Sequence, residues 1–308
     1  MRARTTAGAR AGVKAYSPSH ITGIFAICDD RNPLYKGSIG CGIVLEAGCV
    51  TEVSVDDTRP GMETEVEVEI EGVEEGEAST TEYVCRRMAG EHEYPVRVSS
   101  RFEVPIGAGF GASGAGALST ALALNALLSL GMTLNEVAQI AHLAEVENNT
   151  GLGDVIAETY GGVVIRKKPG PPGIGMVDNI ILPPEELKIS YVTFGVKATR
   201  EILRDASIIR SVNEAGRAAL KELLKKPDLD TFMRAARDFS LQTGLMSERC
   251  RDAIEAVAAE GKVASVAMLG ETVFVPGDSE ALREFGEVRQ SRISYSGARI
   301  IHSYKCDK

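Results

Sequence analysis

The sequence predicts an α+β fold in two domains. Segments typical of strands and of helices alternate through both halves of the chain, as in a sheet covered by helices. The chain has 308 residues, 44% of them hydrophobic and 25% charged, enough to bury a core in one large domain or two ordinary ones. Residues 167–175 (KKPGPPGIG) hold three prolines and three glycines and form the best linker candidate. We therefore expect an N-terminal domain over residues 1–170 and a C-terminal domain over residues 171–308.

The first domain is expected to open with β-structure over residues 14–55. In residues 43–55 (IVLEAGCVTEVSV), apolar and polar side chains alternate around a glycine-containing turn, which is typical of a hairpin. Residues 63–70 (ETEVEVEI) place Glu at every second position and predict a strand with one row of carboxylates. A solvated strand face is the ordinary interpretation of that row, and a metal-binding strip is the alternative.

A helix, a strand and a longer helix are expected next. Residues 80–89 favour a helix and residues 96–104 a strand. The glycine-rich loop 106–111 then leads into a helix of small residues that reaches Leu130. Gly131 fits the position just after that helix, where glycine adopts the left-handed conformation without strain.

Two further helices and a strand complete the first domain. Thr133 with Glu136 three residues later is the signature of a capping box, so the next helix is expected to begin there and to run to about Glu147. A turn rich in Asn and Gly leads to Asp154 and a short helix. Residues 162–166 favour a strand.

The second domain is expected to mix both types of element. The pattern predicts strands at 188–194, 263–269, 272–275 and 290–294 and helices at 199–225, 229–257 and 279–285.

Composition excludes several classes of protein. A net charge of −9 argues against a general nucleic-acid binder. No stretch reaches the ~18 uninterrupted apolar residues of a membrane helix. The N-terminal dozen residues lack the apolar core of a secretory signal, so we expect a leader or a start-site extension there. The six cysteines form no CxxC pair and no zinc-site spacing, so we expect a reduced, cytoplasmic chain without a disulfide scaffold.

The glycines point to an anion site. The chain has 32, and five fall between Gly107 and Gly116 in the segment PIGAGFGASGAGAL. A strand precedes this segment and a helix follows it. Glycines let the backbone approach a phosphate closely, and the unpaired N–H groups at a helix start point toward it. Ser113 could add a hydroxyl for a phosphate or Mg²⁺, or serve as a helix cap.

Competing interpretations of this segment fit less well. Gly109, Gly111 and Gly114 match the dinucleotide fingerprint GxGxxG, but they lie a hundred residues into the chain, and Glu136 stands at a helix start rather than at a strand end. A Walker A loop would need Lys where Ala115 stands. Tight helix packing explains the later glycines and not those before the helix.

The same segment resembles the second signature motif, P-x-x-x-G-L-G-S-S-A-A, of the GHMP kinases, a family that includes galactokinase, homoserine kinase and mevalonate kinase. Residues 17–25 (SPSHITGIF) resemble its first motif, with His20 in place of Lys. Residues 264–270 (ASVAMLG) stand where the third, glycine-rich motif is expected and keep only Gly270. The resemblance implies ATP binding by Pro105, Gly107, Ala108, Gly109, Phe110, Gly111, Ala112, Ser113, Gly114 and Ala115.

Taken together, these segments resemble one subgroup, the archaeal pantoate kinases of coenzyme A synthesis. That resemblance implies an N-terminal domain like the second domain of ribosomal protein S5, with a left-handed βαβ crossover, and a ferredoxin-like C-terminal domain. It also implies transfer of phosphate from ATP, with Mg²⁺, to the primary hydroxyl of (R)-pantoate, giving 4-phosphopantoate, and a possible homodimer. Other acceptors of the mevalonate, homoserine or shikimate type, and a non-catalytic sensor, are the alternatives.

The resemblance also assigns roles to individual residues. Asp154 fits the catalytic Asp, which orients the acceptor hydroxyl and takes its proton; a helix N-cap is the alternative. Ser113 and Glu145 would hold Mg²⁺. A carboxylate at a helix C-terminus opposes the helix dipole, which hints at function, although a solvated helix end is also open. The acceptor-binding candidates are His20, Thr22, Gly23, Arg31, Lys197 and Arg299.

Overall fold

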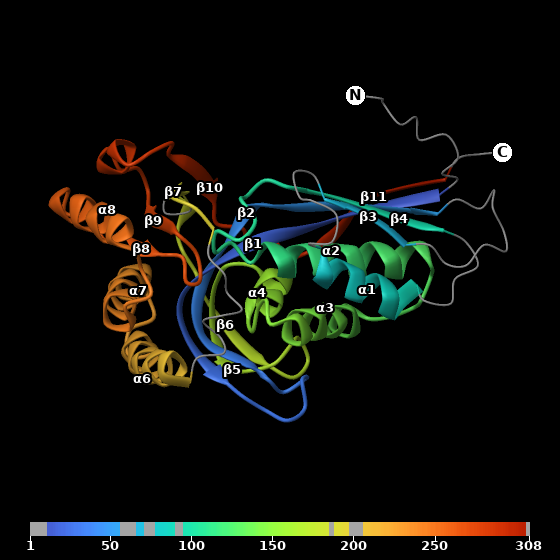
Figure 1. Cartoon of the computed structure of the whole chain (residues 1–308), viewed down its shortest axis with the longest axis horizontal. Coiled ribbons are helices and arrows are strands. Elements are labelled where there is room, and N and C mark those ends of the chain that lie inside the picture. The colour runs from blue at the N-terminus through green and yellow to red at the C-terminus, as the bar shows by residue number, and fades with distance from the viewer. Residues whose placement is uncertain are drawn as a thin grey trace.

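A large twisted sheet with helices on one face runs along most of the molecule, and a smaller sheet with its own helices closes one end (Figure 1). The computed structural model describes residues 11–55, 66–70, 78–89, 95–184, 188–196 and 206–305. The predicted α+β class is confirmed.

The large sheet is built on two long antiparallel strands, β1 and β2. They pair from Ala11 opposite Val55 to Cys28 opposite Gly37. The sheet has the order β11-β1-β2-β4-β3, and β5 and β6 extend it beside the other half of β2. The strands are β1 (Ala11–Cys28), β2 (Gly37–Val55), β3 (Val66–Ile70), β4 (Val96–Phe102), β5 (Val163–Lys168), β6 (Met176–Ile180) and β11 (Arg299–Lys305).

The prediction of a hairpin within residues 43–55 is wrong, because strand β2 continues through these residues without a turn. Gly48 lies where the register between β1 and β2 shifts next to Pro18. A Cβ on Gly48 would overlap the carbonyl oxygen of Ser17. This glycine therefore allows a close approach of two strands at a bulge rather than a chain reversal.

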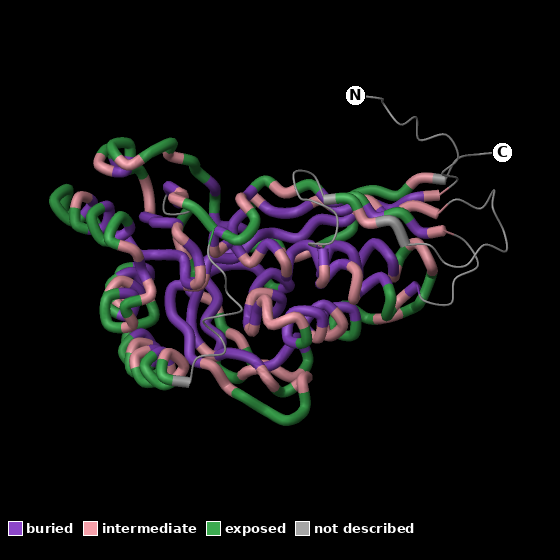
Figure 2. Tube along the Cα trace, viewed as in Figure 1, coloured by how far each residue is buried: buried purple, intermediate pink, exposed green. Residues whose placement is uncertain are grey.

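Four helices accompany the large sheet: α1 (Ser79–Ala89), α2 (Ala112–Leu127), α3 (Leu134–Asn148) and α4 (Asp154–Tyr160). α1 connects the parallel strands β3 and β4. α2 is buried around most of its circumference, and Figure 2 shows the buried chain continuing from the sheet into this helix. Small side chains let α2 lie close to the strands.

The ends of α2 and α3 test two sequence predictions. The capping box of α3 is confirmed, because the Thr133 hydroxyl accepts from the Glu136 amide and Glu136 accepts from the Thr133 amide at 2.7 Å. α2 ends at Leu127, earlier than predicted, and Ser129 rather than Gly131 takes the left-handed position just after its cap (φ 53°).

The smaller sheet has the order β10-β7-β9-β8. Gly244 ends α7 in the left-handed conformation, and Ser247 caps the start of α8, so the single helix predicted over 229–257 is two helices. The elements are β7 (Lys188–Thr193), α6 (Ala206–Leu223), α7 (Leu229–Thr243), α8 (Glu248–Ala259), β8 (Ser265–Val266), β9 (Thr272–Pro276), a 3-10 turn (Ala281–Glu284) and β10 (Arg289–Arg292).

The predicted linker is a hairpin loop of the large sheet. Residues 169–175 connect β5 to β6, and these two strands pair with each other. β11, near the C-terminus, also returns to the large sheet beside β1. The chain therefore does not leave the large sheet at residue 170. Neither β6 nor β11 was predicted from the sequence.

One hydrophobic cluster bridges the two sheets. A single cluster includes Ile21 and Leu45 of the large sheet, Phe274 of the small sheet and Phe232 of α7. Since this cluster packs the two parts against each other, the surface where they meet is built from both. No helix in the described part of the chain is long and apolar enough to cross a membrane.

Candidate active site

A pocket of about 320 Å³ lies where the two sheets meet, within the size range of small-molecule sites. It is lined by Gly107 and residues 109–113 of the glycine loop, by residues 150–154 before and at the start of α4, by Thr22 and Phe25 of β1, and by Met268 and Leu269.

The glycine loop has the backbone of an anion site. Gly107, Gly109 and Gly111 have φ values of 77°, 94° and 62°, which only glycine adopts without strain. Gly111 is the N-cap of α2 and provides no side-chain cap. The amides of the first turn are thus not capped by a side chain and remain available to phosphate oxygens.

The smaller sheet supports this loop directly. Gly270 lies so close that a Cβ on it would overlap the carbonyl oxygen of Ala108. The Thr272 hydroxyl donates to the same oxygen at 2.8 Å. The Phe110 ring packs edge-on against Tyr191, with ring centroids 5.0 Å apart. The loop is therefore held in place before any ligand arrives.

Three charged or polar side chains, those of Arg166, His20 and Asp154, are linked in series by hydrogen bonds beside the pocket. His20 Nδ1 lies 2.7 Å from Asp154 Oδ1, and Arg166 Nη1 lies 3.3 Å from His20 Nε2. Arg can only donate, so His20 Nε2 accepts from Arg166, and the single proton of the neutral ring is on Nδ1. His20 therefore donates to Asp154.

Electrostatics agrees with this assignment. Burial lowers the pKa of His20, and its hydrogen bond with Asp154 offsets this only in part. Burial alone would raise the pKa of Asp154, but the hydrogen bond from His20 and the charge of Arg166 outweigh it and hold that pKa below its usual value. At neutral pH the site holds an ionised Asp154 and a neutral His20.

Asp154 is the first residue of α4, and the N-cap is Gly153. The Asp154 side chain is 19% exposed, whereas His20 is fully buried behind it. A Cβ on Gly151 would lie 3.0 Å from Asp154 Oδ2 and would overlap Glu145 Oε2. The bare backbone of Gly151 thus lies between the two carboxylates, of which Asp154 lines the pocket and Glu145 is buried behind the lining.

One carboxylate oxygen of Glu145 accepts a hydrogen bond, and the other has no hydrogen-bond partner. Oε1 accepts from the Thr150 hydroxyl at 2.7 Å, and Oε2 is buried without a partner. Burial, and then the charge of Asp154, raises its pKa to about 7, although the side chains of Thr150 and Ser113 lower it. Its neighbour Glu147 is exposed. An orphaned buried oxygen beside a hydroxyl suits a hard cation.

No cluster of three or more potential metal ligands of the His, Cys, Asp or Glu type occurs within the described residues. Mg²⁺ commonly takes one or two protein carboxylates and completes its shell with water and phosphate oxygens. Glu145 and Ser113 fit that pattern.

Glu158 was missed by sequence reasoning. It lies four residues after Asp154, on the same face of α4, and both its carboxylate oxygens are buried without a hydrogen-bond partner. Burial above all, and then the charges of Asp154 and Glu145, raises its pKa well above the usual value. Gly111 and Gly114 leave the space that this carboxyl occupies. The i, i+4 spacing of two acidic residues was the available signal.

Arg166 and Ser38 were also missed. Arg166 is 1% exposed, lines the pocket and has a buried Nε without a partner. Ser38 lines the pocket beside it, since a Cβ on Gly153 would contact both residues. A charged residue at the end of the otherwise apolar strand 163–166 was the signal. Among the described residues, no carboxylate forms an ion pair with Arg166, and such a buried guanidinium is a natural site for an anionic group.

The predicted acceptor residues divide into two groups. Thr22 lines the pocket and His20 lies behind Asp154. Gly23 packs instead against Phe232 of α7.

Two of the three predicted cations, Arg31 and Arg299, are not brought to the pocket. Arg31 is exposed in the β1–β2 loop. Arg299, on β11, stacks over the ring of Tyr16 on β1, with its guanidinium carbon 4.5 Å from the ring centroid. Lys197 lies outside the described residues. The guanidinium that the structure brings to the pocket is that of Arg166.

The predicted ATP-binding residues also divide. Gly107, Gly109, Phe110, Gly111, Ala112 and Ser113 line the pocket. Pro105, Ala108, Gly114 and Ala115 do not line it; Ala108 contacts the smaller sheet, and Gly114 and Ala115 are buried in α2.

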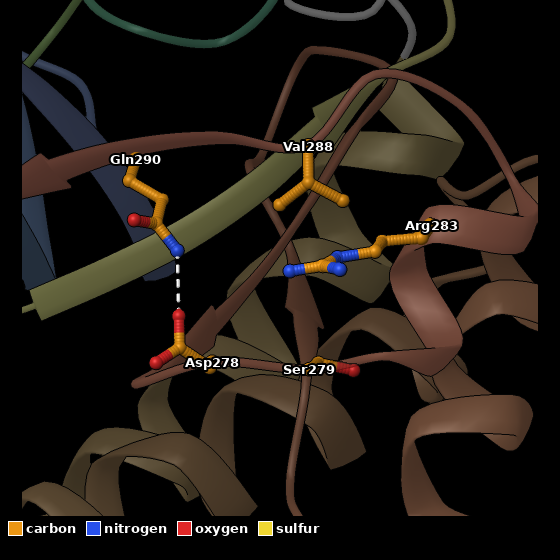
Figure 3. A pocket seen from close by; sticks show the side chains of 5 residues that line it. All are labelled: Asp278, Ser279, Arg283, Val288 and Gln290. Atoms are coloured by element: carbon orange, nitrogen blue, oxygen red, sulfur yellow. Dashed lines mark hydrogen bonds between the residues drawn. The ribbon is translucent and has the colours of Figure 1, made fainter.

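A second pocket, of about 450 Å³, is lined by Asp278, Ser279, Arg283, Val288 and Gln290 (Figure 3). Its Asp278 already accepts from Gln290 at 2.6 Å and from Lys188 at 2.7 Å. This pocket has neither a glycine loop nor an unpartnered buried carboxylate, so its lining offers no means of phosphoryl transfer.

Known proteins resemble this chain in sequence and in fold. Residues 78–162 match the family described as GHMP kinases N terminal domain. The chain is 36% identical over 291 residues to the pantoate kinase of Thermococcus kodakarensis, covering 94% of this chain and 95% of that protein. This chain belongs to the pantoate kinase family of GHMP kinases. A second family member, from Methanocaldococcus jannaschii, is 37% identical and covers 87% of this chain and 94% of its own.

A solved structure supports the same assignment to the pantoate kinase family. It is described as a phosphotransferase related to the CoA biosynthesis pathway and superposes with a TM-score of 0.80 at 33% identity, covering 94% of this chain and 98% of that one. The two-domain GHMP kinase fold implied by the sequence motifs is therefore confirmed.

Proposed function

We propose that this GHMP kinase transfers the γ-phosphoryl group of ATP to the primary hydroxyl of (R)-pantoate and so forms 4-phosphopantoate. The observation that carries the proposal is the carboxylate of Asp154, which is ionised, anchored at Oδ1 and partly exposed to a pocket that begins at a phosphate-type glycine loop. The names of the curated relatives support pantoate as the acceptor.

Asp154 acts on the acceptor hydroxyl. With Oδ1 bonded to His20, Oδ2 is the oxygen that can receive the hydroxyl hydrogen bond. The hydroxyl oxygen attacks the γ-phosphorus as the bond to the β,γ-bridging oxygen breaks, and the hydroxyl proton passes to Asp154. The hydrogen bond from His20 fixes the carboxylate, so little reorientation is needed at the moment of transfer.

Arg166 holds the other end of pantoate. Its guanidinium lines the same pocket and is linked to Asp154 through His20, so a carboxylate bound there keeps a fixed relation to the catalytic oxygen. Ser38 can donate a second hydrogen bond. This assignment replaces Arg31 and Arg299, which lie elsewhere.

The glycine loop binds the triphosphate through its backbone amides, and Ser113 with Glu145 would hold Mg²⁺, which neutralises phosphate charge when bound. The absence of a lysine between Lys36 and Lys167 is compatible with this arrangement, because amides and a metal ion supply the positive field. A cytoplasmic location and a homodimer stay predictions.

An acceptor panel tests the proposal. ADP release is measured with purified protein, ATP, Mg²⁺ and, in turn, pantoate, mevalonate, homoserine and shikimate. We expect turnover with pantoate and formation of 4-phosphopantoate by phosphorus NMR. Turnover with a different acceptor and none with pantoate would overturn the assignment of pantoate as the substrate. Tight binding of ATP and pantoate without formation of ADP would indicate a sensor.

A further inference from the structure

Leu269 adopts a backbone conformation that its side chain disfavours. Its φ is 63°, and the other described non-glycine residues with positive φ are Ser129 and Asn149, both at helix C-termini. Glycine would fit this position without strain, and glycine follows immediately at 270. A strained residue held at a functional site suggests that its side chain has a use there.

The turn that carries Leu269 reaches the acceptor end of the pocket. The Met268 amide donates to the carbonyl oxygen of Thr22 at 2.9 Å. The Thr22 hydroxyl in turn lies 3.5 Å from Nδ1 of His20, the ring that holds Asp154. The turn is thus three contacts from the catalytic carboxylate, through Thr22 and His20.

Met268, Leu269 and Phe25 line the pocket together and form what we call the apolar wall. Met268 and Phe25 are buried in the core of the smaller domain, whereas Leu269 is partly exposed. The same pocket is also lined by Asp154, Arg166 and Ser38, which are charged or polar. A ligand that satisfies both sets must combine a hydroxyl and an anionic group with an apolar body.

We propose that Leu269, supported by Met268 and Phe25, is a specificity-determining residue that selects a hydroxy acid with a branched apolar carbon between its hydroxyl and its carboxylate. Pantoate has such a carbon, since C3 carries two methyl groups. The inference rests on the proposed function, because it assigns the acceptor to this end of the pocket. It gives a reason for a bulky residue where the related kinases are expected to have a glycine-rich motif.

Leu269→Gly is a clean probe, because the positive φ suits glycine and the substitution removes only the side chain. Rates are measured with pantoate and with 2,4-dihydroxybutanoate, which lacks both methyl groups. A hydrophobic pocket discriminates roughly 10-fold or more per missing apolar group. We expect the wild type to prefer pantoate by at least about 10-fold in kcat/KM, and Leu269→Gly to lose most of that preference through a higher KM for pantoate.

Leu241→Ala is the matched control. Leu241 is an exposed apolar residue on α7, outside the pocket lining, and its truncation should leave the preference and both KM values unchanged. The melting temperature of each variant separates loss of the wall from loss of folding.

The outcomes are distinct. If the wild type does not phosphorylate pantoate, the proposed function fails. If it does, and Leu269→Gly keeps the wild-type preference, the apolar wall is refuted. A rise in the KM for ATP, with an unchanged preference for pantoate over 2,4-dihydroxybutanoate, would indicate that Leu269 contacts the nucleotide. That result would also refute the apolar wall. An equal fall with both acceptors would show a structural role alone.

Discussion

His20 Nδ1 donates to Asp154 Oδ1 at 2.7 Å, although the two residues lie 134 positions apart in the chain. This bond divides the carboxylate into one anchored oxygen and one that can serve the acceptor. His20 stands where the related kinases are expected to have Lys, so a neutral ring supplies the anchor here. We treat His20 as a positioning residue, because it acts through Asp154 rather than on the reacting atoms.

Removing the His20 ring should move the pH profile. Without the hydrogen bond that lowers its pKa, Asp154 in His20→Ala would ionise only at higher pH. The acid limb of kcat/KM against pH should therefore shift upward, because the ionised form is the active one. His20→Gln, whose amide can still donate, should shift it less. An unchanged acid limb in His20→Ala would show that the ring does not tune Asp154.

Arg166 should control the acceptor and not the nucleotide. Truncation to Met removes a buried charge that we assign to the pantoate carboxylate, and losing one partner of such a pair costs about 2–5 kcal/mol, or roughly 30-fold to several thousand-fold in kcat/KM for pantoate. The KM for ATP should change little. Arg166→Lys should recover only part, because Lys lacks the bidentate geometry. Equal effects on both substrates would argue against the assignment.

Glu145 should set the requirement for metal. In Glu145→Gln the Mg²⁺ concentration needed for half-maximal rate should rise, because the amide is a poorer ligand for a hard cation. Glu147→Gln is the matched control, since Glu147 is exposed at the same helix end. Titration of rate against Mg²⁺ gives both values. Identical curves for the two variants would remove Glu145 from the metal site.

The buried carboxyl of Glu158 should make the free energy of unfolding fall as the pH rises. Its pKa is raised on folding, so above the ordinary value of 4.5 the unfolded chain releases a proton that the folded protein keeps. Stability is therefore lost with increasing pH, by about 1.4 kcal/mol for each pH unit over which only the unfolded chain is ionised. Glu158→Gln cannot ionise and should gain stability relative to wild type between pH 5 and pH 8.

Urea unfolding at the two pH values measures this difference. Glu145 contributes a trend of the same sign in both proteins, because its pKa is also raised, and it cancels in the comparison. A difference between Glu158→Gln and wild type that does not change with pH would mean that Glu158 is ionised in the folded protein.

Local features of the site were predictable from the sequence. The glycine loop, the capping box of Thr133 and Glu136 and the start of the helix at Asp154 depend on neighbours within a few residues, so their signals lie in short segments. The proposed roles of Asp154, Glu145 and Ser113 came from motif positions, and they stay proposals.

Contacts between distant segments could not be predicted in this way. Arg166 and His20 lie 146 positions apart, and nothing near either residue indicates the other. β6 and β11 were missed because they have few apolar residues in regular alternation and gain their pairing from strands far away in the sequence. Gly48 suggested a turn, because the sequence shows that a glycine is needed but not that a strand crosses close by.

The substitution Asp154→Asn tests the central claim most directly. The change keeps the size of the side chain and removes the ability to accept the hydroxyl proton. We expect kcat to fall by about 10²–10⁴-fold, the usual contribution of a general base, while calorimetry shows ATP and pantoate still binding. A variant that phosphorylates pantoate at the full wild-type rate would contradict the account.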